Sequence, residues 1–330
     1  MKRKMEVSEL IFKIIAYVLL IFFAVICVYP FLYALGSSFS SAAGIEQGIV
    51  LWPLIGESGN VHFGFTGEAF MWAFTETEFW IAYANTLFMT FFGTIWSLFY
   101  SILGAYALSK KRIMGRRGWN FFLVFTMWFT AGVVATYSNY VTTGEVFASI
   151  AGMDPGSWQT SIDGKWLIVI AMGMNATNII LLRNSFEGVP AEIEEAARID
   201  GATEIQVLTK VYIPMSKATI ATVALFFGIS RWNGYFWAMR VLGTEASGQA
   251  YSWPVQVYLR NFLETYTQII SPAPQDWEYT QALWQGQYGD LSATACAYAI
   301  VVCSVIPILV IYPFIQKYFA KGVNMGGVKE

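Results

Sequence analysis

Six long apolar stretches constrain the fold of this chain more than any other feature of its sequence. They run at about 10–35, 82–108, 119–141, 166–186, 218–239 and 292–315. A helix needs about 20 apolar residues to cross a bilayer, and each stretch is long enough. Only 13% of the residues are charged, against about 25% in ordinary globular chains. We therefore predict an all-α polytopic membrane protein with six transmembrane helices in a single domain over residues 1–330.

The distribution of Lys and Arg predicts how the chain is oriented in the membrane. Of the 20 basic residues, 16 lie in the N-terminal segment, in the loops after the second and fourth stretches, and in the tail. Loops rich in Lys and Arg stay in the cytoplasm. We expect a multi-pass protein of the cell membrane with both termini and the loop 187–216 cytoplasmic. The long loops 36–81 and 240–291 then lie outside, and their short apolar segments predict folded caps.

The segment Ala191–Pro214 is a charged island that carries the signals of two helices. Pro190 suits a first helical turn, because its missing N–H would be unpaired there. Glu192, Glu194 and Glu195 follow in the first turns, where the positive end of the helix dipole favours acids. Gly201 fits the left-handed position just past a helix end. A helix, a tight turn and a second helix are therefore predicted.

The second helix of this segment has its own start and stop signals. Thr203, with Gln206 three residues later, has the pattern of a capping box. Its apolar side is expected to consist of Ile205, Leu208 and Val211. Pro214 is expected to end the helix, because proline lacks the backbone N–H that a helix interior needs.

Within the charged island, one motif resembles a known family. Glu195-Ala196-Ala197, then Gly201, then Val211-Tyr212-Ile213-Pro214, resembles the EAA loop of ABC importer permeases. Val211 and Ile213 stand where that pattern usually has Ile and Leu. The segments 183–190 and 316–323 are similar to the carbohydrate-uptake branch, of the maltose-importer type, and the likeness covers nearly the whole chain.

The resemblance implies a type I permease subunit of a binding-protein-dependent ABC importer for a sugar or oligosaccharide. Its implied partners are a second permease in a heterodimer, two nucleotide-binding ATPase subunits, an extracellular solute-binding protein and membrane lipid. ATP and Mg would be bound by the ATPase subunits, so no cofactor is expected in this chain. By resemblance, the residues that couple to the ATPase in a cytoplasmic coupling helix hairpin are Glu195, Ala196, Ala197, Asp200, Gly201 and Pro214.

The sequence offers no catalytic constellation. The phosphate-loop pattern G-x-x-x-x-G-K-[ST] is absent, so ATP is not expected to bind here by a Walker A motif. The single histidine, His62, has no neighbouring Cys or second His that could complete a metal site. The three cysteines lie in apolar stretches and are expected to be small buried residues. We predict no enzyme activity, no metal site and no nucleic-acid partner.

Two polar groups inside the apolar stretches are candidates for a translocation path. Asn175, Thr177 and Asn178 either bond neighbouring helices or line that path. Arg231 is followed by Trp232 and Asn233, and an arginine at a span centre costs roughly 2.5–3.5 kcal/mol. Either its side chain extends to the outer headgroups, or it lines a polar cavity with Asn233 and a stacking ring. Both interpretations stay open.

Two other functions compete with sugar import. An importer of peptide, amino acid or anion would share the same loop motif. A membrane-embedded enzyme would need a cluster of titratable groups inside the membrane, and the apolar stretches hold only Arg231.

Overall fold

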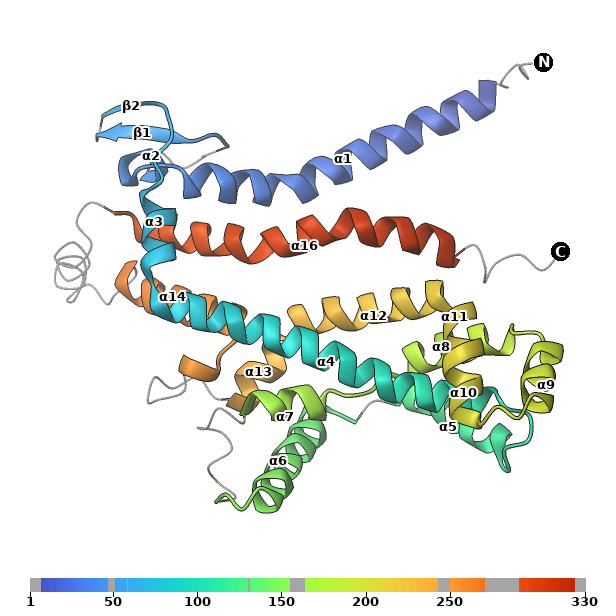
Figure 1. The fold of residues 1–330 in the computed structure, drawn as a ribbon. Coiled ribbons are helices and arrows are strands. Elements are labelled where there is room, and N and C mark those ends of the chain that lie inside the picture. Colours follow the sequence, from blue (N-terminus) through green and yellow to red (C-terminus); the bar gives the residue numbers. More distant parts are fainter. Residues whose placement is uncertain are drawn as a thin grey trace. The chain divides into compact units, whose positions relative to one another are not determined.

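The computed structural model describes residues 7–46, 51–57, 59–129, 131–154, 164–242, 250–270 and 291–323. The chain forms two compact units, which are described separately. One unit comprises Met1–Thr77 and Leu259–Ile306, and the other comprises Glu78–Tyr258 and Pro307–Glu330. Figure 1 shows that both are built mainly of helices. The chain is thus mostly helical, as predicted.

Three single helices in the described residues are long and apolar enough to span a membrane. They are α1 (Val7–Ser38), α4 (Thr77–Ser109) and α16 (Ala293–Val323), and they cover the first, second and last predicted stretches. Three further pairs of shorter helices meet the same criteria only when each bent pair is counted together.

The first unit begins with α1, whose side chains are mostly exposed. Its apolar window has no buried residue in this chain. Cys27 therefore departs from the expectation of burial and is exposed, whereas Cys296 and Cys303 on α16 are buried as expected. The exposed apolar side chains of α1 are suited to lipid or to a neighbouring subunit.

The loop after α1 contains a feature that the all-α prediction missed. After α2 (Ala42–Glu46), β1 (Leu54–Glu57) and β2 (Asn60–Phe63) form an antiparallel hairpin with Leu54 opposite Phe63. Gly59 in its turn has φ +91°, a conformation that favours glycine. The hairpin is held to the end of α1, because Ser41 N–H donates to the Leu54 carbonyl (2.9 Å). The described part of this loop is thus folded, as predicted.

The core of the first unit is formed by small residues. Ala69 on α3 (Glu68–Thr75) is buried with Ala295, Cys296 and Ala299 of α16. Small side chains let two helices approach closely. Trp72 of α3 packs on Phe262 of α14 (Val255–Ile270), with ring centroids 5.3 Å apart.

The second unit is built around α4 and a series of shorter elements. In chain order these are α5 (Arg116–Trp128), α6 (Val133–Ile150), α7 (Gly164–Ala171), α8 (Ala176–Glu187), α9 (Ala191–Ile199), α10 (Glu204–Val207), the π-helical η2 (Leu208–Tyr212), α11 (Ile213–Met215), α12 (Lys217–Trp232), α13 (Tyr235–Leu242) and the short 3-10 helix η3 (Ala250–Ser252).

Three predicted spans are not continuous helices, which corrects the sequence analysis. The stretch 119–141 is divided between α5 and α6, which are bent by 116°. The stretch 166–186 is divided between α7 and α8, bent by 52°, because Asn175 caps α8 and accepts from Asn178 N–H. The stretch 218–239 is interrupted after Trp232, before α13 begins at Tyr235.

The breaks divide the buried side chains of this unit into two clusters. The α7 cluster consists of Met89, Tyr140, Ala148, Leu167, Ile168, Ala238, Met239, Val241, Leu242, Trp253 and Val257. The α8 cluster consists of Ala105, Ile179, Leu182, Phe186, Val207, Leu208, Tyr212, Val223 and Phe227. Thus α7 and α13 lie in one cluster and α8 and α12 in the other, while α4 contributes to both.

Polar side chains of α4 fix the segment that precedes α14. Asn85 Nδ2 donates to the carbonyls of Tyr251 (2.7 Å) and Trp253 (3.0 Å). The hydroxyl of Thr86 accepts from Val255 N–H (2.8 Å). Both side chains are buried, so these bonds satisfy groups that would otherwise be costly to bury. The segment 251–255 of the second long loop is therefore fixed against α4.

Candidate functional site

The charged island forms the predicted helical hairpin, α9 to α11. Helix α9 begins one residue later than expected, because Pro190 is its N-cap and Ala191 its first helical residue. Gly201 has φ +79°, the left-handed conformation that the turn requires. Its N–H donates to the Arg198 carbonyl (3.0 Å), which closes the end of α9.

The second arm of the hairpin starts as predicted but buries a different face. Thr203 and Gln206 form the capping box, with both reciprocal bonds present. Leu208 packs in the α8 cluster and Val211 packs against it, but Ile205 is 74% exposed. The expected apolar side is therefore wrong at Ile205. Val207 and Tyr212 are buried there in addition.

Pro214 does not end the second arm, which corrects a further expectation. A proline inside an α-helix conflicts with the carbonyl four residues earlier. Here the preceding turn widens into the π-helical η2, and Ile213 N–H donates to the carbonyl of Leu208, five residues back. The helix continues to Met215, and the chain then turns by 87° at Ser216 into α12.

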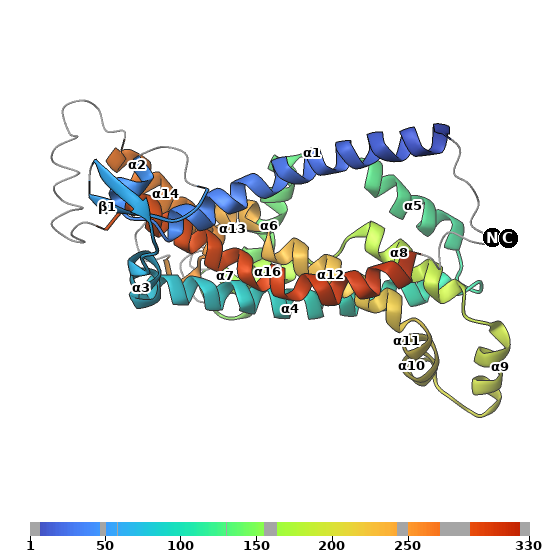
Figure 2. The ribbon, with the colours of Figure 1, turned by 90° about the horizontal axis from the view of Figure 1, so that it is seen from above.

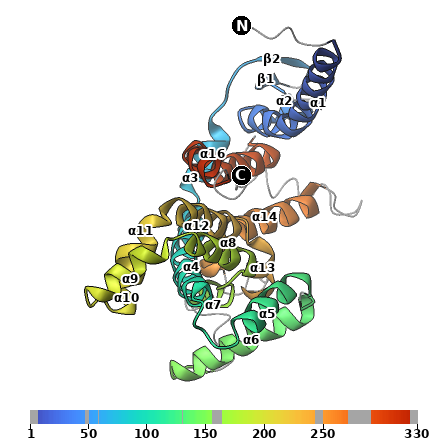
Figure 3. The same cartoon turned by 90° about the vertical axis from the view of Figure 1, so that its right-hand side faces the viewer.

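The hairpin presents most of the predicted coupling residues to its surroundings. Glu195, Ala196, Asp200, Gly201 and Pro214 are exposed, while Ala197 is half-buried against the α8 cluster. Figures 2 and 3 show α9 and α10 projecting beyond α4, α8 and α12. Ile199, at the end of α9, is 86% exposed. The projecting surface therefore combines carboxylates with apolar side chains.

An ion-pair network holds the hairpin to the end of α4. Lys110 Nζ lies 2.8 Å from Glu194, and Arg198 pairs with the same carboxylate (2.9 Å). Arg198 also pairs with Glu204 of the second arm (2.6 Å), and Arg112 bonds Glu204 as well. Both arms of the hairpin are thus joined to each other and to the residues that follow α4.

Two tyrosines complete this network. The ammonium of Lys110 lies 4.3 Å from the ring centroid of Tyr106 and 4.0 Å from that of Tyr212, which favours cation–π attraction. Partial burial opposes ionisation of Glu194. Hydrogen bonds from Lys110, Tyr212 and Arg198 outweigh it and lower the pKa of Glu194 to about 2. The carboxylate is therefore ionised at neutral pH.

A cavity of about 470 Å³ lies at the break between α7 and α8. Its lining residues are Tyr140, Ala171, Met172, Met174, Asn175, Thr177, Asn178, Phe226, Phe227, Ser230 and Arg231. The lining therefore mixes amide and hydroxyl groups with two phenyl rings. The size is within the range of ordinary ligand sites.

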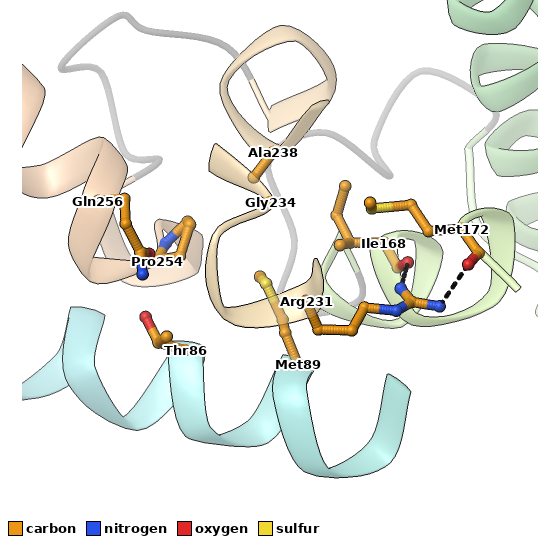
Figure 4. Close-up of a pocket in the computed structure, with 9 residues that line it drawn as sticks. All are labelled: Thr86, Met89, Ile168, Met172, Arg231, Gly234, Ala238, Pro254 and Gln256. Carbon is orange, nitrogen blue, oxygen red and sulfur yellow. Dashed lines mark hydrogen bonds between the residues drawn. The ribbon is translucent and has the colours of Figure 1, made fainter. Parts of the chain in front are cut away.

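Arg231 borders this cavity, but its guanidinium is engaged by the protein. Nη1 donates to the Ile168 carbonyl (2.6 Å), and Nη2 donates to the carbonyls of Val169 (3.1 Å) and Met172 (2.6 Å). Nη2 also donates to the hydroxyl of Ser97 on α4 (2.9 Å). Figure 4 shows the side chain reaching from α12 to the end of α7, beside a second pocket of about 10 Å³. Arg231 is only 8% exposed, so it does not extend to headgroups.

The other two residues of that sequence cluster lie elsewhere. Trp232 is buried with its ring 6.0 Å from that of Tyr83, and its carbonyl accepts from Gln256 Nε2. Asn233 is exposed at the end of α12. The structure thus brings Asn175, Asn178 and Arg231 to one cavity, and the described lining does not include Trp232 or Asn233.

A family model covers most of the chain. Residues 79–325 match the family described as binding-protein-dependent transport system inner membrane component. The chain belongs to this family. It is a permease subunit of a transporter and not an enzyme, as the EAA resemblance implied. No group of three or more metal-ligating side chains occurs in the described residues.

Individual relatives of this permease are similar over nearly the whole chain. The polygalacturonan/rhamnogalacturonan transport system permease protein YtcP of Bacillus subtilis is 30% identical, with 97% of this chain and 98% of that protein covered. Protein LplC of Bacillus subtilis is also 30% identical, with 92% and 90% covered.

Two solved structures share the fold of the permease. A chain of a bacterial ABC transporter involved in the import of the acidic polysaccharide alginate has a TM-score of 0.76 and 38% identity. It covers 96% of this chain and 100% of its own. A bacterial alginate ABC transporter in complex with alginate pentasaccharide-bound periplasmic protein has a TM-score of 0.60 at 15% identity, with 93% of each chain covered, and shows the fold alone.

Several residues that shape these sites of the permease escaped the sequence analysis. Lys110 counted only as one of a run of basic residues, although it is the centre of the network at the hairpin. Gly93 and Ser97 of α4 receive the Arg231 side chain. Their four-residue spacing of small side chains on a span was a signal for close helix packing that could have found them.

Proposed function

We propose that this chain is one of two permease subunits of an ATP-driven importer that moves an acidic oligosaccharide delivered by an extracellular solute-binding protein. The observation that carries the proposal is the 38% identity, over 96% of this chain, to a chain of an importer for the acidic polysaccharide alginate. A second relative is named for the transport of polygalacturonan and rhamnogalacturonan.

The cavity at the α7–α8 break supports an oligosaccharide as the transported solute. Asn175 and Thr177 are exposed there and offer amide and hydroxyl groups for sugar hydroxyls. Phe226 and Phe227 offer apolar faces for sugar rings. We assign the translocation path to this cavity, with Asn175, Asn178 and Arg231 at its wall.

The projecting hairpin supports coupling to a separate ATPase. Exposed Ile199 and Ile205 flank the turn, and Glu195 and Asp200 add carboxylates. This is the composition of an interface that buries apolar anchors inside a polar rim. ATP and Mg would be held by the two ATPase subunits, and this chain would bring no cofactor of its own.

We propose a topology of six spans with both termini in the cytoplasm. The three single helices α1, α4 and α16 supply three spans. The bent pairs α5–α6 and α7–α8 supply two more. We assign the last span to α12 followed by α13, which leaves the EAA hairpin before α12 in the cytoplasm. Broken spans are tolerated where neighbouring helices satisfy the freed backbone groups.

The proposal is tested by uptake in cells of the source strain from which only this gene is deleted. We expect the deletion strain to lose uptake of labelled oligogalacturonate or alginate oligosaccharide and to regain it with a plasmid copy. Uptake of a maltodextrin and of a dipeptide serves as the matched control and should not change. Loss of maltodextrin or dipeptide uptake, with acidic oligosaccharide uptake intact, would refute the proposed substrate class.

A further inference from the structure

The end of helix α7 leaves backbone carbonyls that need partners. The last four carbonyls of an α-helix have no partner within the helix. In α7 these include the carbonyl of Val169, and the chain breaks before α8 can supply N–H groups. Val169 is buried, and an unpaired carbonyl at such a depth is costly.

Arg231 supplies the missing donors. Its two terminal nitrogens donate to the carbonyls of Ile168, Val169 and Met172, all at the end of α7. The negative end of the α7 dipole also attracts the guanidinium charge. Its hydrogen-bond acceptors among the described residues are backbone carbonyls and one serine hydroxyl, with no carboxylate. Arg231 is thus a C-terminal cap of α7 that comes from another helix.

The surface of α4 is shaped to receive this cap. A Cβ atom added to Gly93 would lie 3.0 Å from Nε and 3.1 Å from Cζ of Arg231. Ser97, one turn further along α4, accepts a hydrogen bond from the same guanidinium (2.9 Å). A side chain at position 93 would therefore push the Arg231 guanidinium by a few tenths of an ångström without removing it.

The cap joins the two parts of this unit across the breaks. Arg231 belongs to α12, which packs in the α8 cluster together with the hairpin residues Val207 and Leu208. The carbonyls that it binds belong to α7, which packs in the α7 cluster. The 470 Å³ cavity lies at the same place and is lined from both sides.

We propose that Arg231 is a positioning residue that makes α7 follow the movement of the coupling hairpin. Without the cap, the breaks at Met172–Asn175 and Asn233–Gly234 would absorb that movement, because both already lack continuous helical bonds. This inference rests on the proposed function, since it needs an ATPase that moves the hairpin. The inference adds the route by which a movement of the hairpin reaches α7, through Arg231, at the wall of the cavity opposite α8 and α12.

The test uses two single-cysteine reporters on opposite sides of the break. Cys27, Cys296 and Cys303 are replaced by alanine, and then Ala171→Cys places a reporter on α7 or Thr177→Cys places one on α8. The complex is purified through a tag on this chain with its co-purifying subunits. The rate of maleimide labelling is compared without nucleotide and with ATP and vanadate.

In the otherwise unaltered protein, we expect both reporters to change their labelling rate when the nucleotide is trapped. For each reporter, we take the labelling rate with ATP and vanadate divided by the rate without nucleotide. With Arg231→Met, this ratio should become about 1 at position 171 and stay different from 1 at position 177, because coupling is then lost only across the break. A retained response at position 177 shows that the variant is folded and still driven by the ATPase.

A second variant keeps Arg231 and has a matched control. Gly93→Ala should reduce the response at position 171, because the new Cβ displaces the guanidinium. Gly104→Ala, on the same helix, has nothing within 4 Å of the added Cβ and should leave it unchanged. An undiminished response at position 171 in both Arg231→Met and Gly93→Ala overturns the inference. If neither reporter responds in the parent protein, the proposed ATP-driven import fails and the inference fails with it.

Discussion

Two buried cationic side chains of this permease are stabilised in different ways, and each shows which groups can compensate for burying a charge. Lys110 is 8% exposed and has a carboxylate and two tyrosine rings around its ammonium. Arg231 is equally buried but binds carbonyls at the end of a helix. A planar guanidinium spreads its donors over separate nitrogens in a fixed fork, so one side chain can reach three carbonyls, whereas an ammonium offers its three donors from a single atom.

Glu194 gives a prediction for acidic pH. Its pKa of about 2 in the folded chain is below the ordinary value of 4.5, so its ion pairs stabilise the hairpin fully above about pH 4.5. That contribution is lost as the pH falls from 4.5 towards 2. Because the carboxylate is partly exposed to solvent, we expect it to be on the order of 1 kcal/mol.

Thermal unfolding of the purified permease in detergent measures this effect. Glu194→Gln should lower the Tm at pH 7, and the difference from the unsubstituted protein should shrink below pH 4.5. Glu195→Gln changes an exposed neighbouring carboxylate and is the control. A Tm difference that stays the same from pH 7 to pH 3.5 would show that charge on Glu194 is not what stabilises the hairpin.

Among the elements, the hairpin depends on one backbone conformation. Gly201 has φ +79°, yet a Cβ added there would meet nothing within 4 Å. A side chain at this position therefore has room, and its cost is conformational, roughly 1–2 kcal/mol for most residues. Asparagine tolerates the left-handed conformation better than other side chains do.

We expect Gly201→Val to abolish the stimulation of ATPase activity by loaded binding protein in the reconstituted complex, and Gly201→Asn to keep most of it. Both variants should remain in the membrane. Equal loss in the two variants would mean that any side chain at position 201 prevents stimulation, as expected if Gly201 directly contacts a partner. The turn conformation would then not be the cause of the loss.

Local signals explain which parts of this hairpin could be predicted. The capping box and Gly201 involve residues within a few positions of each other, so the sequence reveals them. The prediction that Ile205 is buried assumed a regular helical period. The π-helical turn that follows breaks the 3.6-residue period, so the predicted face was wrong at Ile205. The partners of Arg231 lie 59 to 134 residues away, and no sequence pattern connects such distant positions.

For the whole molecule, hydropathy predicts apolar stretches but does not show where the helices within them break. Asn175 and Gly234 interrupt stretches that are apolar enough to be read as continuous spans. At the α7–α8 break, backbone carbonyls accept hydrogen bonds from Arg231, which is distant in the sequence.

Topology is tested with single cysteines in the cysteine-free background. We expect Ser58→Cys, Ser157→Cys and Ser247→Cys, at positions outside the described residues, to react with an impermeant maleimide added to spheroplasts. Cysteines that replace the exposed residues Lys111 and Thr209 should react only after the membrane is opened. Labelling at position 209 in sealed spheroplasts would place the hairpin outside and contradict both the topology and the coupling role.

The two exposed isoleucines of the hairpin affect how stable the unassembled chain is in the cell. Ile199 and Ile205 are 86% and 74% exposed in the single chain. Covering such a side chain fully is worth about 1.5–3 kcal/mol. Under the proposed coupling role, a permease made without its ATPase leaves these two apolar side chains uncovered. Surfaces of this kind are what proteases and chaperones recognise. The cellular level of this chain should therefore follow the supply of its ATPase, so that unassembled copies are removed before they accumulate.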